Sequence, residues 1–473
     1  MICASHVAHK WFIYLMADER RQDKAELHAD AVVIGGGLAG QAAAIHLARA
    51  GLRVVCLEPR ESFHHIVGES LDWSAPQLFE QLGLNMKELV ATGAATFKRH
   101  ITVTSADGST EEYLPGAWLA KHPWNVELRT LHLDRERVND KLLQEVNRYP
   151  IVTLRERAVG LEIRNRRILA VETSHGRCIR ASWIIDASGA AASILGREFS
   201  LPSVAYGPRK VAVWAHFPTE DWVEGTTLYM LSPAGEYMEW IWEIPIRPGV
   251  SSIGYVAPGS QVKVQRAHGL SNSAILSEKM RRFTRLGSLI CDGHPDHVAV
   301  TSFLCRTYKG VCGPNWIIIG EAASQSDPIT GNGVTAALRH AAEGCALVSR
   351  YQQRGSIPAL ARLAYNLRVL GVGRFFNSLI EKMFYETHLR ARLGLFAIAR
   401  AYTVPAWLTN LIYSRVRPKR IVGTVLFCSA LLAMRGAVWA ASRLSRFFAP
   451  RSRRYRHEVD ERKEQRRALY APR

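Results

Sequence analysis

Residues 31–40 of the chain read AVVIGGGLAG, and this stretch decides the fold of the segments around it. An apolar, β-branched run ends in Gly35, Gly37 and Gly40, spaced as G-x-G-x-x-G, and helix-forming residues follow at 41–50. The first glycine permits a tight turn, the second lets a pyrophosphate approach the backbone, and the third lets the helix pack closely on the strand. The pattern predicts a strand, a turn and a helix whose amino terminus faces phosphate groups.

A second apolar run at residues 53–57 ends at Glu58. A carboxylate about 20 residues after the glycines accepts hydrogen bonds from the hydroxyls of a ribose. Strand, glycine turn, helix and acid together predict a dinucleotide site, for which FAD and NAD are both candidates.

Two later strands also end in polar turns. Residues 181–189, ASWIIDASG, read as a buried strand that ends at Asp186 and Gly189, although Asp, Ser and Gly are equally common in ordinary turns. Residues 316–323, WIIIGEAA, form a similar strand, which is followed by the turn DPITGNG at 327–333 and a helix at 334–347. The backbone amides of this late turn can face an anion or an electron-rich ring.

Residues 205–303 alternate between apolar and polar side chains and are rich in aromatic and β-branched types, which predicts a large sheet. Within them, EWIWEIP at 239–245 places Trp240, Trp242 and Ile244 on one face of a strand. Tryptophans on a strand are most often core residues, so this face is expected to pack against other apolar groups.

Residues 95–103, ATFKRHITV, read as one strand that carries a lysine among apolar neighbours. On residue type alone, Lys98 is expected to face solvent.

The three motifs, in this order, resemble those of the FAD-dependent aromatic hydroxylases and halogenases over residues 30–350. The resemblance implies an α/β fold: a Rossmann-like FAD-binding domain of the glutathione-reductase type, an inserted, mostly antiparallel β-sheet substrate domain and a helical C-terminal region. It implies FAD as the cofactor, with the helix after the late turn directed at the flavin ring. The family's late Gly-Asp-Ala motif reads Gly320-Glu321-Ala322 here. The residues to which the resemblance assigns cofactor contacts are Gly35, Gly37, Ala39, Gly40, Glu58, Arg135, Asp186, Gly189, Glu321, Asp327, Gly331, Asn332 and Gly333.

Within that superfamily, Trp240, Trp242, Ile244 and Pro245 match the W-x-W-x-I-P signature of flavin-dependent halogenases. The segment VGESL at residues 67–71 resembles one found in phenol and pyrrole halogenases and in geranylgeranyl reductases. The resemblance also aligns Lys98 with the lysine that holds hypohalous acid or a haloamine. It therefore implies catalytic roles for Lys98, Trp240 and Trp242, the tryptophan pair keeping the substrate away from the flavin.

The late turn departs from one branch of the family. Tryptophan halogenases carry PLESTG, whereas residues 328–333 read PITGNG, which is closer to the monooxygenase form. Free tryptophan is therefore not the expected substrate. The leading interpretation is halogenation of an electron-rich aromatic or carrier-bound substrate with reduced flavin, O2 and halide. Hydroxylation of an aromatic, including a protein-borne one, is the second, and a geranylgeranyl-reductase-like flavoprotein is the third.

A fourth interpretation is a membrane-bound flavoprotein that does not turn over. The family's reductases carry Tyr-x-Trp-x-Phe-Pro, so Trp240 and Ile244 favour the halogenase form, and intact flavin motifs favour an enzyme. No second G-x-G-x-x-G is present for NADPH. This predicts that a separate flavin reductase supplies reduced flavin, although several single-component hydroxylases also lack that motif.

Composition limits the other classes of function. The net charge is +19, but residues 415–473 contain 16 Lys and Arg against 4 Asp and Glu, so most of the excess belongs to the tail and no nucleic-acid partner is expected. The eight cysteines are scattered without a C-x-x-C motif, which favours a reducing, cytoplasmic location and predicts no metal site. No Gly-x-Ser-x-Gly elbow supports a hydrolase.

The C-terminal region carries an apolar run. Residues 421–434 are uncharged and mostly apolar, Arg435 follows, and arginine-rich clusters flank the run on both sides. A spanning helix needs about 20 apolar residues, so we expect residues 415–454 to make a peripheral, interfacial membrane contact. The alternative is a helical cap that packs on the FAD domain.

These patterns divide the chain into five parts. They are an N-terminal extension (1–29), a discontinuous FAD-binding domain (30–100, 125–200 and 304–352), a substrate domain (101–124 and 201–303), a C-terminal helical region (353–448) and a basic tail (449–473).

Overall fold

The computed structural model describes residues 26–399, apart from 62, 64–65, 73–75, 114–129, 191–192, 223, 233–235, 292–294, 296, 386–389 and 391–392, together with scattered residues between 429 and 443. The first 25 residues of the expected extension, most of the expected membrane-contact segment 415–454 and the whole basic tail lie outside this described part.

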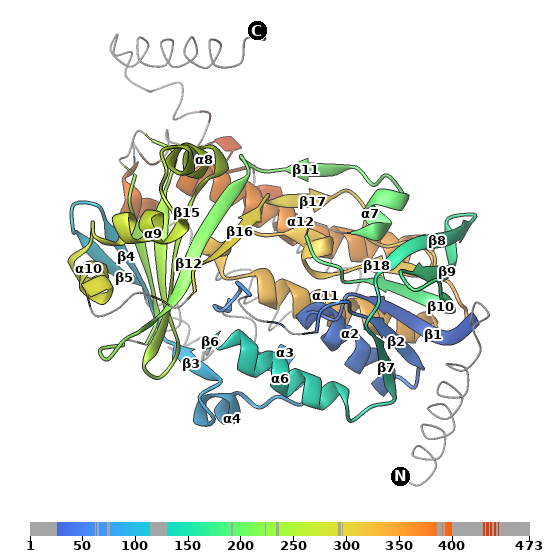
Figure 1. Cartoon of the computed structure of the whole chain (residues 1–473). Coiled ribbons are helices and arrows are strands. Elements are labelled where there is room, and N and C mark those ends of the chain that lie inside the picture. Colours follow the sequence, from blue (N-terminus) through green and yellow to red (C-terminus); the bar gives the residue numbers. More distant parts are fainter. Residues whose placement is uncertain are drawn as a thin grey trace, which may run out of the picture.

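A seven-stranded sheet forms one half of the molecule (Figure 1). Its strands, in spatial order, are β7 (Ile151–Leu154), β2 (Val54–Leu57), β1 (Glu26–Ile34), β10 (Cys178–Asp186), β9 (Arg167–Thr173) and β8 (Ala158–Arg164). The seventh strand, β18 (Trp316–Ile318), runs parallel to the last residues of β10. The pairs β7–β2, β2–β1 and β1–β10 are also parallel, so the predicted strands 53–57, 181–186 and 316–319 all end at the same edge as β1. β1 itself begins at Glu26, four residues before the expected domain start.

Three helices accompany this sheet, and the first and last of them begin at glycine turns. They are α2 (Leu38–Arg49), α6 (Arg135–Val146) and α11 (Gly333–Tyr351). α2 and α11 pack extensively on each other, and their apolar faces join the strands in one core. The first and the last glycine motifs are thereby brought together, since a β-carbon at Gly320 would lie 3.0 Å from that of Ala39.

A second seven-stranded sheet forms the other half of the molecule (Figure 1). In spatial order its strands are β16 (Ala299–Phe303), β12 (Lys210–Pro218), β15 (Val250–Pro258), β14 (Trp240–Arg247), β13 (Thr226–Met230), β4 (Ile101–Ser105) and β5 (Thr110–Tyr113). Every neighbouring pair is antiparallel except β13–β4. The mixed α/β fold with a mostly antiparallel second sheet is confirmed.

The expectation of strands throughout residues 205–303 is wrong for 259–291. Three helices occupy that stretch, α8 (Gly259–Ala267), α9 (Asn272–Met280) and α10 (Thr284–Cys291). Their apolar side chains recur three to five residues apart, which is the helical rather than the strand period. They cover the face of the sheet that carries Ile241 and Ile253.

The predicted single strand at 95–103 is two strands in two sheets. β3 (Ala95–Lys98) pairs with β6 (Thr130–Leu133) in a two-stranded sheet, whereas β4 joins the large second sheet. The chain turns at Arg99 and His100, so the two halves of the stretch connect the two parts of the molecule.

Short elements complete the connections. They are α3 (Pro76–Glu80), α4 (Met86–Ala91), α7 (Ile194–Glu198), β11 (Ser203–Ala205), β17 (Arg306–Tyr308), β19 (Ser324–Gln325) and the 3-10 turns η1 (Gly320–Ala322) and η2 (Pro328–Thr330).

The C-terminal helix α12 (Ala359–Ile380) continues directly into a π-helical turn, η3 (Glu381–Tyr385). Their aromatic and aliphatic side chains pack on the sheet face that carries Trp240, Trp242 and Ile244. Within the described residues, no helix combines the length and the apolar character that a bilayer crossing requires.

Candidate functional site

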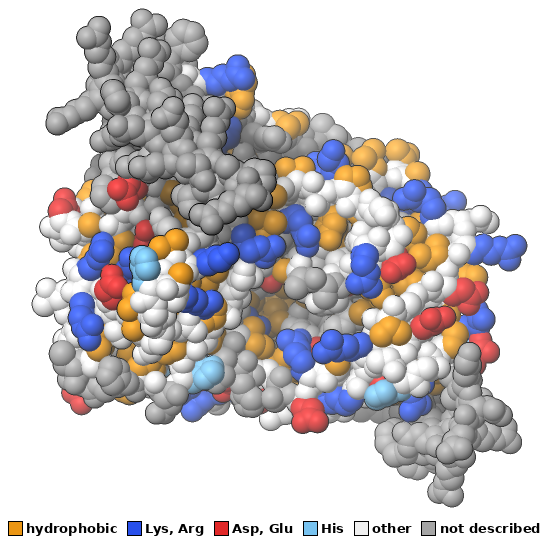
Figure 2. Space-filling model, turned by 45° about the horizontal axis from the view of Figure 1, so that its top comes forward, with side chains coloured by type: hydrophobic (Ala, Val, Ile, Leu, Met, Phe, Trp, Pro, Cys, Tyr) orange, Lys and Arg blue, Asp and Glu red, His pale blue; other side chains and the backbone are white. Residues whose placement is uncertain are grey.

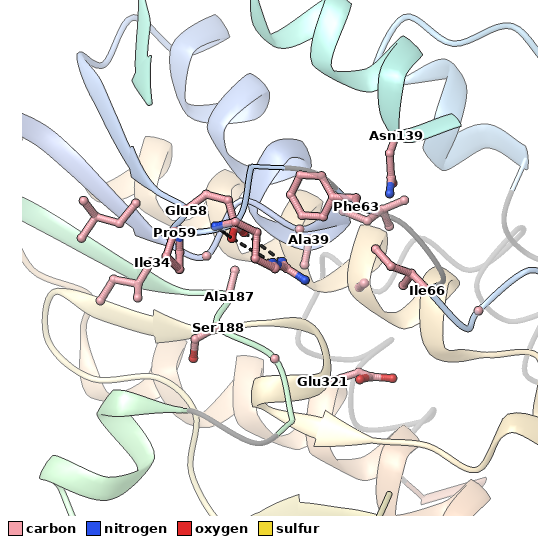
Figure 3. Close-up of a pocket in the computed structure, with 18 of the residues that line it drawn as sticks. Ile34, Ala39, Glu58, Pro59, Phe63, Ile66, Asn139, Ala187, Ser188 and Glu321 are labelled. Atoms are coloured by element: carbon pink, nitrogen blue, oxygen red, sulfur yellow. Dashed lines mark hydrogen bonds and ion pairs between the residues drawn. The ribbon is translucent and has the colours of Figure 1, made fainter. Parts of the chain in front are cut away.

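A cavity of about 610 Å³ opens where β1, β2 and β10 end. In open parallel sheets, ligands bind at the carboxyl ends of the strands, and a volume of this size is typical of a ligand site. The lining of this cavity comes from the glycine turn, the end of β2, the turn after β10 and the late turn at 327–333, which is called the late loop from here on. Figure 3 shows part of this lining.

The glycine turn at the end of β1 leaves space for a ligand at one glycine only. A β-carbon at Gly40 would lie 1.8 Å from the carbonyl oxygen of Gly35, and one at Gly35 would lie 2.6 Å from the carbonyl oxygen of Ala187. Gly35 also has φ +98°, which favours glycine. Gly37, the N-cap of α2, faces open space except for Arg60 at 3.6 Å. The turn is therefore built as a backbone cradle for an anion at the start of a helix.

Glu58 closes one side of the cavity. Its carboxylate accepts hydrogen bonds from the backbone N–H of Gly36 at 2.8 Å and from the guanidinium of Arg60 at 2.9 Å. Burial opposes ionisation, but these hydrogen bonds outweigh it and hold the pKa of Glu58 below its ordinary value. The side chain is therefore an ionised acceptor at the place where a ribose hydroxyl would bind.

Asp186 organises the turn after β10 from within. It is fully buried and accepts hydrogen bonds from the backbone N–H of Ser188 and Leu195 and from the hydroxyl of Ser193, at 3.0 to 3.1 Å. Its carboxylate therefore shapes the turn that presents Ser188 and Gly189 to the cavity, while Asp186 itself is not among the lining residues. Burial outweighs these hydrogen bonds and raises its pKa.

The side chain of Arg135 is held by hydrogen bonds to the backbone of the segment VGESL at residues 67–71. Its guanidinium donates to the carbonyl oxygens of Val67 and Gly68, at 3.3 and 3.0 Å. Gly68 has φ +115°, and a β-carbon there would lie 2.7 Å from the same guanidinium. The next residue, Glu69, is buried and pairs with the imidazole of His216 on β12 at 2.7 Å. The segment therefore joins the cofactor cavity to the second sheet.

Glu321 stands in place of the family's aspartate and reaches into the cavity (Figure 3). A β-carbon at Gly333 would lie 3.6 Å from its carboxylate, so the acid sits at the start of α11. Desolvation raises the pKa of Glu321, and the charge of nearby Arg135 partly offsets this effect.

The predicted cofactor residues fall into two groups. Eight line the cavity: Gly35, Gly37, Ala39, Glu58, Arg135, Gly189, Glu321 and Gly333. Five do not line it: Gly40, Asp186, Asp327, Gly331 and Asn332. Several other lining residues were not predicted, among them Arg60, Phe63, Ile66, Arg157 and Arg197. Of these five, only Arg60 could have been found from the sequence, because it follows Glu58 at the end of a predicted strand.

The charge of the lining suits an anionic cofactor. Four arginines line the cavity against three glutamates, namely Arg60, Arg135, Arg157 and Arg197 against Glu58, Glu156 and Glu321, so cations are in slight excess. Figure 2 shows Lys and Arg side chains gathered about the hollowed middle of one face of the molecule. A cleft lined by cations attracts phosphate groups. Among the described residues, no group of three or more His, Cys, Asp or Glu side chains could hold a metal ion.

Lys98 lies beside the late loop and is only 5% exposed, so the expectation of a solvent-facing lysine is wrong. Its ammonium group donates to the hydroxyl of Ser70 at 3.0 Å and to the carbonyl oxygen of Leu71 at 3.1 Å. A β-carbon at Gly331 would lie 3.5 Å from Nζ. Burial lowers the pKa of Lys98 to about 8, although the charge of Asp72 acts in the opposite direction.

Trp240 and Trp242 share one face of β14, as the alternation predicts. Their ring centroids lie 5.8 Å apart, and both side chains are almost fully buried. The indole N–H of Trp242 donates to Ser252 at 3.1 Å, and that of Trp240 donates to the hydroxyl of Tyr385 at 2.8 Å. Their strand also contacts β3, because the hydroxyl of Thr96 donates to the carbonyl of Pro245.

The open space at Gly37, the ionised Glu58 and the cationic lining fit the ADP half of FAD, and Glu321 and the start of α11 fit its flavin half. With the parallel sheet and the inserted antiparallel sheet, this site defines an FAD-dependent oxidoreductase of the glutathione-reductase-type fold.

The chain belongs to the tryptophan halogenase family, whose model matches residues 30–116 and 121–385. It is 26% identical to a tryptophan 2-halogenase of Chondromyces crocatus over 378 residues, which cover 76% of this chain and 68% of that protein. It is 24% identical to a 1H-pyrrole-2-carbonyl-[peptidyl-carrier protein] chlorinase of Pseudomonas fluorescens, over 66% of this chain and 74% of that protein.

The fold is shared with solved structures of similar proteins. The flavin-dependent brominase Bmp2 superposes with a TM-score of 0.64 at 19% identity, over 80% of this chain and 93% of that protein. The chain is thus an FAD-dependent oxidoreductase of the halogenase class.

Proposed function

We propose that this protein halogenates an electron-rich aromatic substrate, free or carrier-bound, with reduced FAD, O2 and halide. The observation that carries the proposal is the buried Lys98, whose ammonium group lies beside Gly331 of the late loop. A hydroxylase needs no such lysine at its flavin loop, whereas a halogenase needs a group that holds an electrophilic halogen away from solvent.

The chemistry of Lys98 suits that role. Its pKa of about 8 leaves a fraction of the amine unprotonated at neutral pH, and an unprotonated amine is a nucleophile toward electrophilic halogen. The protonated amine can instead donate a hydrogen bond to hypohalous acid. In both forms, Ser70 and Leu71 fix the direction of Nζ.

The residues of the cavity would hold FAD, which supplies the reducing equivalents and the activation of O2 when bound. The glycine turn at Gly37 and Glu58 would bind the pyrophosphate and the ribose of its ADP half. Glu321, Gly333 and the amides at the start of α11 would meet its flavin half. Trp240 and Trp242 would wall the chamber so that the substrate meets the halogen at Lys98 rather than the flavin.

The substrate proposal rests on the departure in the late loop. This chain has Thr330 and Gly331 where tryptophan halogenases carry glutamate and serine, so an aromatic other than free tryptophan is favoured. The test is to incubate the FAD-loaded protein with reduced flavin, O2, chloride or bromide, and a panel of phenols, indoles and carrier-bound pyrroles. A monohalogenated product from at least one panel member is expected. Hydroxylated products in the presence of halide would favour the monooxygenase alternative.

We also propose that a separate flavin reductase supplies the reduced FAD. The sequence offers no second glycine motif for a nicotinamide dinucleotide. NADH or NADPH alone should leave the bound FAD oxidised, whereas adding an unrelated flavin reductase should start product formation. Reduction of the bound FAD by NADPH alone would contradict this proposal.

A peripheral membrane contact through residues 415–454 is a further part of the proposal. Leu432 and Trp439, which are described, are 65% and 48% exposed, and the guanidinium of Arg443 lies 4.3 Å from the ring centroid of Trp439. Exposed apolar side chains among cations suit an anionic bilayer surface. The full chain should float with anionic liposomes and a truncation at residue 414 should not, while both retain FAD. Equal flotation of the two forms would exclude the contact.

We also propose that the chain divides into the domains that the sequence patterns predict. The segments 30–100, 125–200 and 304–352 would form the FAD-binding domain, and 101–124 and 201–303 the substrate domain.

A further inference from the structure

A buried cluster of charged groups lies between the late loop, the second sheet and the C-terminal helix. Lys210 on β12 and Asp327 at the start of the late loop are each 1% exposed, and their Nζ and Oδ2 atoms are 3.0 Å apart. The same ammonium group lies 3.2 Å from the carboxylate of Glu381 in η3. Burial alone would lower the pKa of Lys210, but the two carboxylates outweigh it and raise the pKa, so the lysine is charged.

A second line of hydrogen bonds passes through the same cluster. The indole N–H of Trp240 donates to the hydroxyl of Tyr385 at 2.8 Å, and that hydroxyl donates to Oδ1 of Asp327 at 3.1 Å. Oδ1 of Asp327 also accepts a hydrogen bond from the backbone N–H of Ile329. The backbone carbonyl oxygen of Asp327 accepts one from the hydroxyl of Thr330. One connected chain of hydrogen bonds therefore leads from the signature tryptophan to the backbone of the late loop.

The buried surroundings make the geometry of these connected hydrogen bonds sensitive to the loss of any one partner. The cluster is enclosed by apolar side chains of β14, α12 and η3, so few other partners are within reach. Hydrogen bonds in such a setting fix geometry strongly, because a group that loses its partner there is left unsatisfied. The π-helical turn that supplies Tyr385 and Glu381 is itself a rare conformation, which is frequent at functional sites.

We propose that Tyr385 and Lys210 are positioning residues, which fix Trp240 relative to the late loop 327–333 and so keep the reaction at Lys98. Neither residue lines the FAD cavity or contacts Lys98 in the described structure, so each acts through another group. The link to Lys98 is short, since Gly331, four residues after Asp327, faces its Nζ. This inference rests on the proposed halogenation, and it makes the π-helical turn part of the framework of the reaction chamber.

The test compares two tyrosines that differ in their partners. Tyr385→Phe removes the hydroxyl that joins Trp240 to Asp327 and keeps the ring, which stacks on Tyr237 with centroids 5.0 Å apart. Tyr237→Phe is the matched control, because that hydroxyl donates only to Glu381, at 2.9 and 3.1 Å. The readout is the ratio of halogenated product to released hydrogen peroxide in a single turnover of each FAD-loaded variant, in which only the bound flavin is reduced, because free reduced flavin would itself react with O2 and release peroxide. This ratio does not depend on how much of the protein is folded.

Tyr385→Phe should lower the ratio about tenfold, because it removes the buried hydrogen bonds with Trp240 and Asp327, while flavin oxidation continues. Tyr237→Phe should change it less than about twofold. An unchanged ratio in Tyr385→Phe, or an equal fall in both variants, would overturn the inference. A wild-type protein that makes no halogenated product would refute the proposed halogenation instead.

A second measurement does not use turnover. Lys210→Met leaves the buried carboxylates of Asp327 and Glu381 without their cation, so the late loop should shift and FAD should bind about tenfold more weakly in a fluorescence titration. Lys210→Arg keeps the charge and should restore most of the affinity. If Lys210→Met binds FAD as tightly as the wild type does, the cluster does not position the loop, whether or not the enzyme halogenates.

Discussion

Gly37 and Gly40 belong to the same turn, but the space around them differs. A β-carbon at Gly40 would collide with the carbonyl of Gly35, whereas one at Gly37 would meet only the tip of Arg60. The two glycines therefore serve different purposes. Gly40 has no room for a side chain in this fold, and we propose that the open space at Gly37 is used by the cofactor.

We predict that Gly37→Ala lowers FAD affinity at least about tenfold without changing the melting temperature, because the added methyl group occupies the space of the pyrophosphate. Gly40→Ala should instead destabilise the protein by about 3 kcal/mol or more, since backbone must move. Flavin fluorescence titration and thermal unfolding separate the two effects. Unchanged flavin affinity in Gly37→Ala would contradict the cofactor assignment.

Lys98 is the residue on which we propose that halogenation depends. We predict that Lys98→Met keeps the fold and FAD binding, oxidises reduced flavin and releases peroxide, but yields at least about a hundredfold less halogenated product. Lys87→Met, an exposed lysine on α4, is the control and should behave like the wild type. Product formation that survives in Lys98→Met would assign the chemistry to another group.

The burial of Lys98 could not be predicted from its neighbours. Its strand has the alternation of a half-exposed β-strand, and a lysine there normally reaches solvent. What covers it is the segment at Ser70 and Leu71, which is distant in sequence and bonds to the ammonium group. The motif resemblance identified the residue, whereas its environment required the tertiary structure.

At the level of elements, the segment VGESL holds β12 to the cofactor cavity through Glu69 and His216. Burial opposes protonation of the imidazole, but the hydrogen bond and the charge of Glu69 outweigh it, so the pKa of His216 is raised above 6.5. A raised pKa in the folded state means that protonated His216 stabilises the protein below pH 6.5. This contribution is lost as the pH rises through the raised pKa.

We therefore predict that His216→Gln lowers the melting temperature on the order of 1–2 °C at pH 6 and much less at pH 9. Thermal unfolding of both forms across this range gives the comparison. A difference that grows with pH would show that the imidazole is neutral in the fold and that Glu69 is held by another group.

The elements of the FAD half were predicted more completely than those of the second sheet. Strands β1, β2, β10 and β18 each end in a glycine or an acid at a ligand-binding edge, so their motifs mark them in the sequence. Helices α8 to α10 were missed, although their apolar residues have helical spacing, for example Leu276 and Met280 in α9 and Leu286 and Ile290 in α10. Because alternation was expected throughout residues 205–303, the local change from the strand period to the helical period was overlooked.

At the scale of the whole molecule, the two sheets meet across the late loop. That loop contacts Lys98 through Gly331, Glu321 through Gly333, and the C-terminal turn through Asp327. The family resemblance implies that this loop meets the flavin, but its connection to Lys210 and Glu381 could not be predicted. Those residues lie 117 and 54 positions from Asp327, and charged residues at such separations carry no pairing signal in a single sequence.

Halogenation requires that the site oxidise halide for transfer to carbon, rather than transfer oxygen to the substrate. Mass spectrometry distinguishes the two reactions when the product is formed from reduced FAD, bromide and isotopically labelled O2 with a substrate identified in the panel. We predict a product with the two-isotope pattern of bromine and no label from O2. A product that carries the oxygen label and no bromine would contradict it.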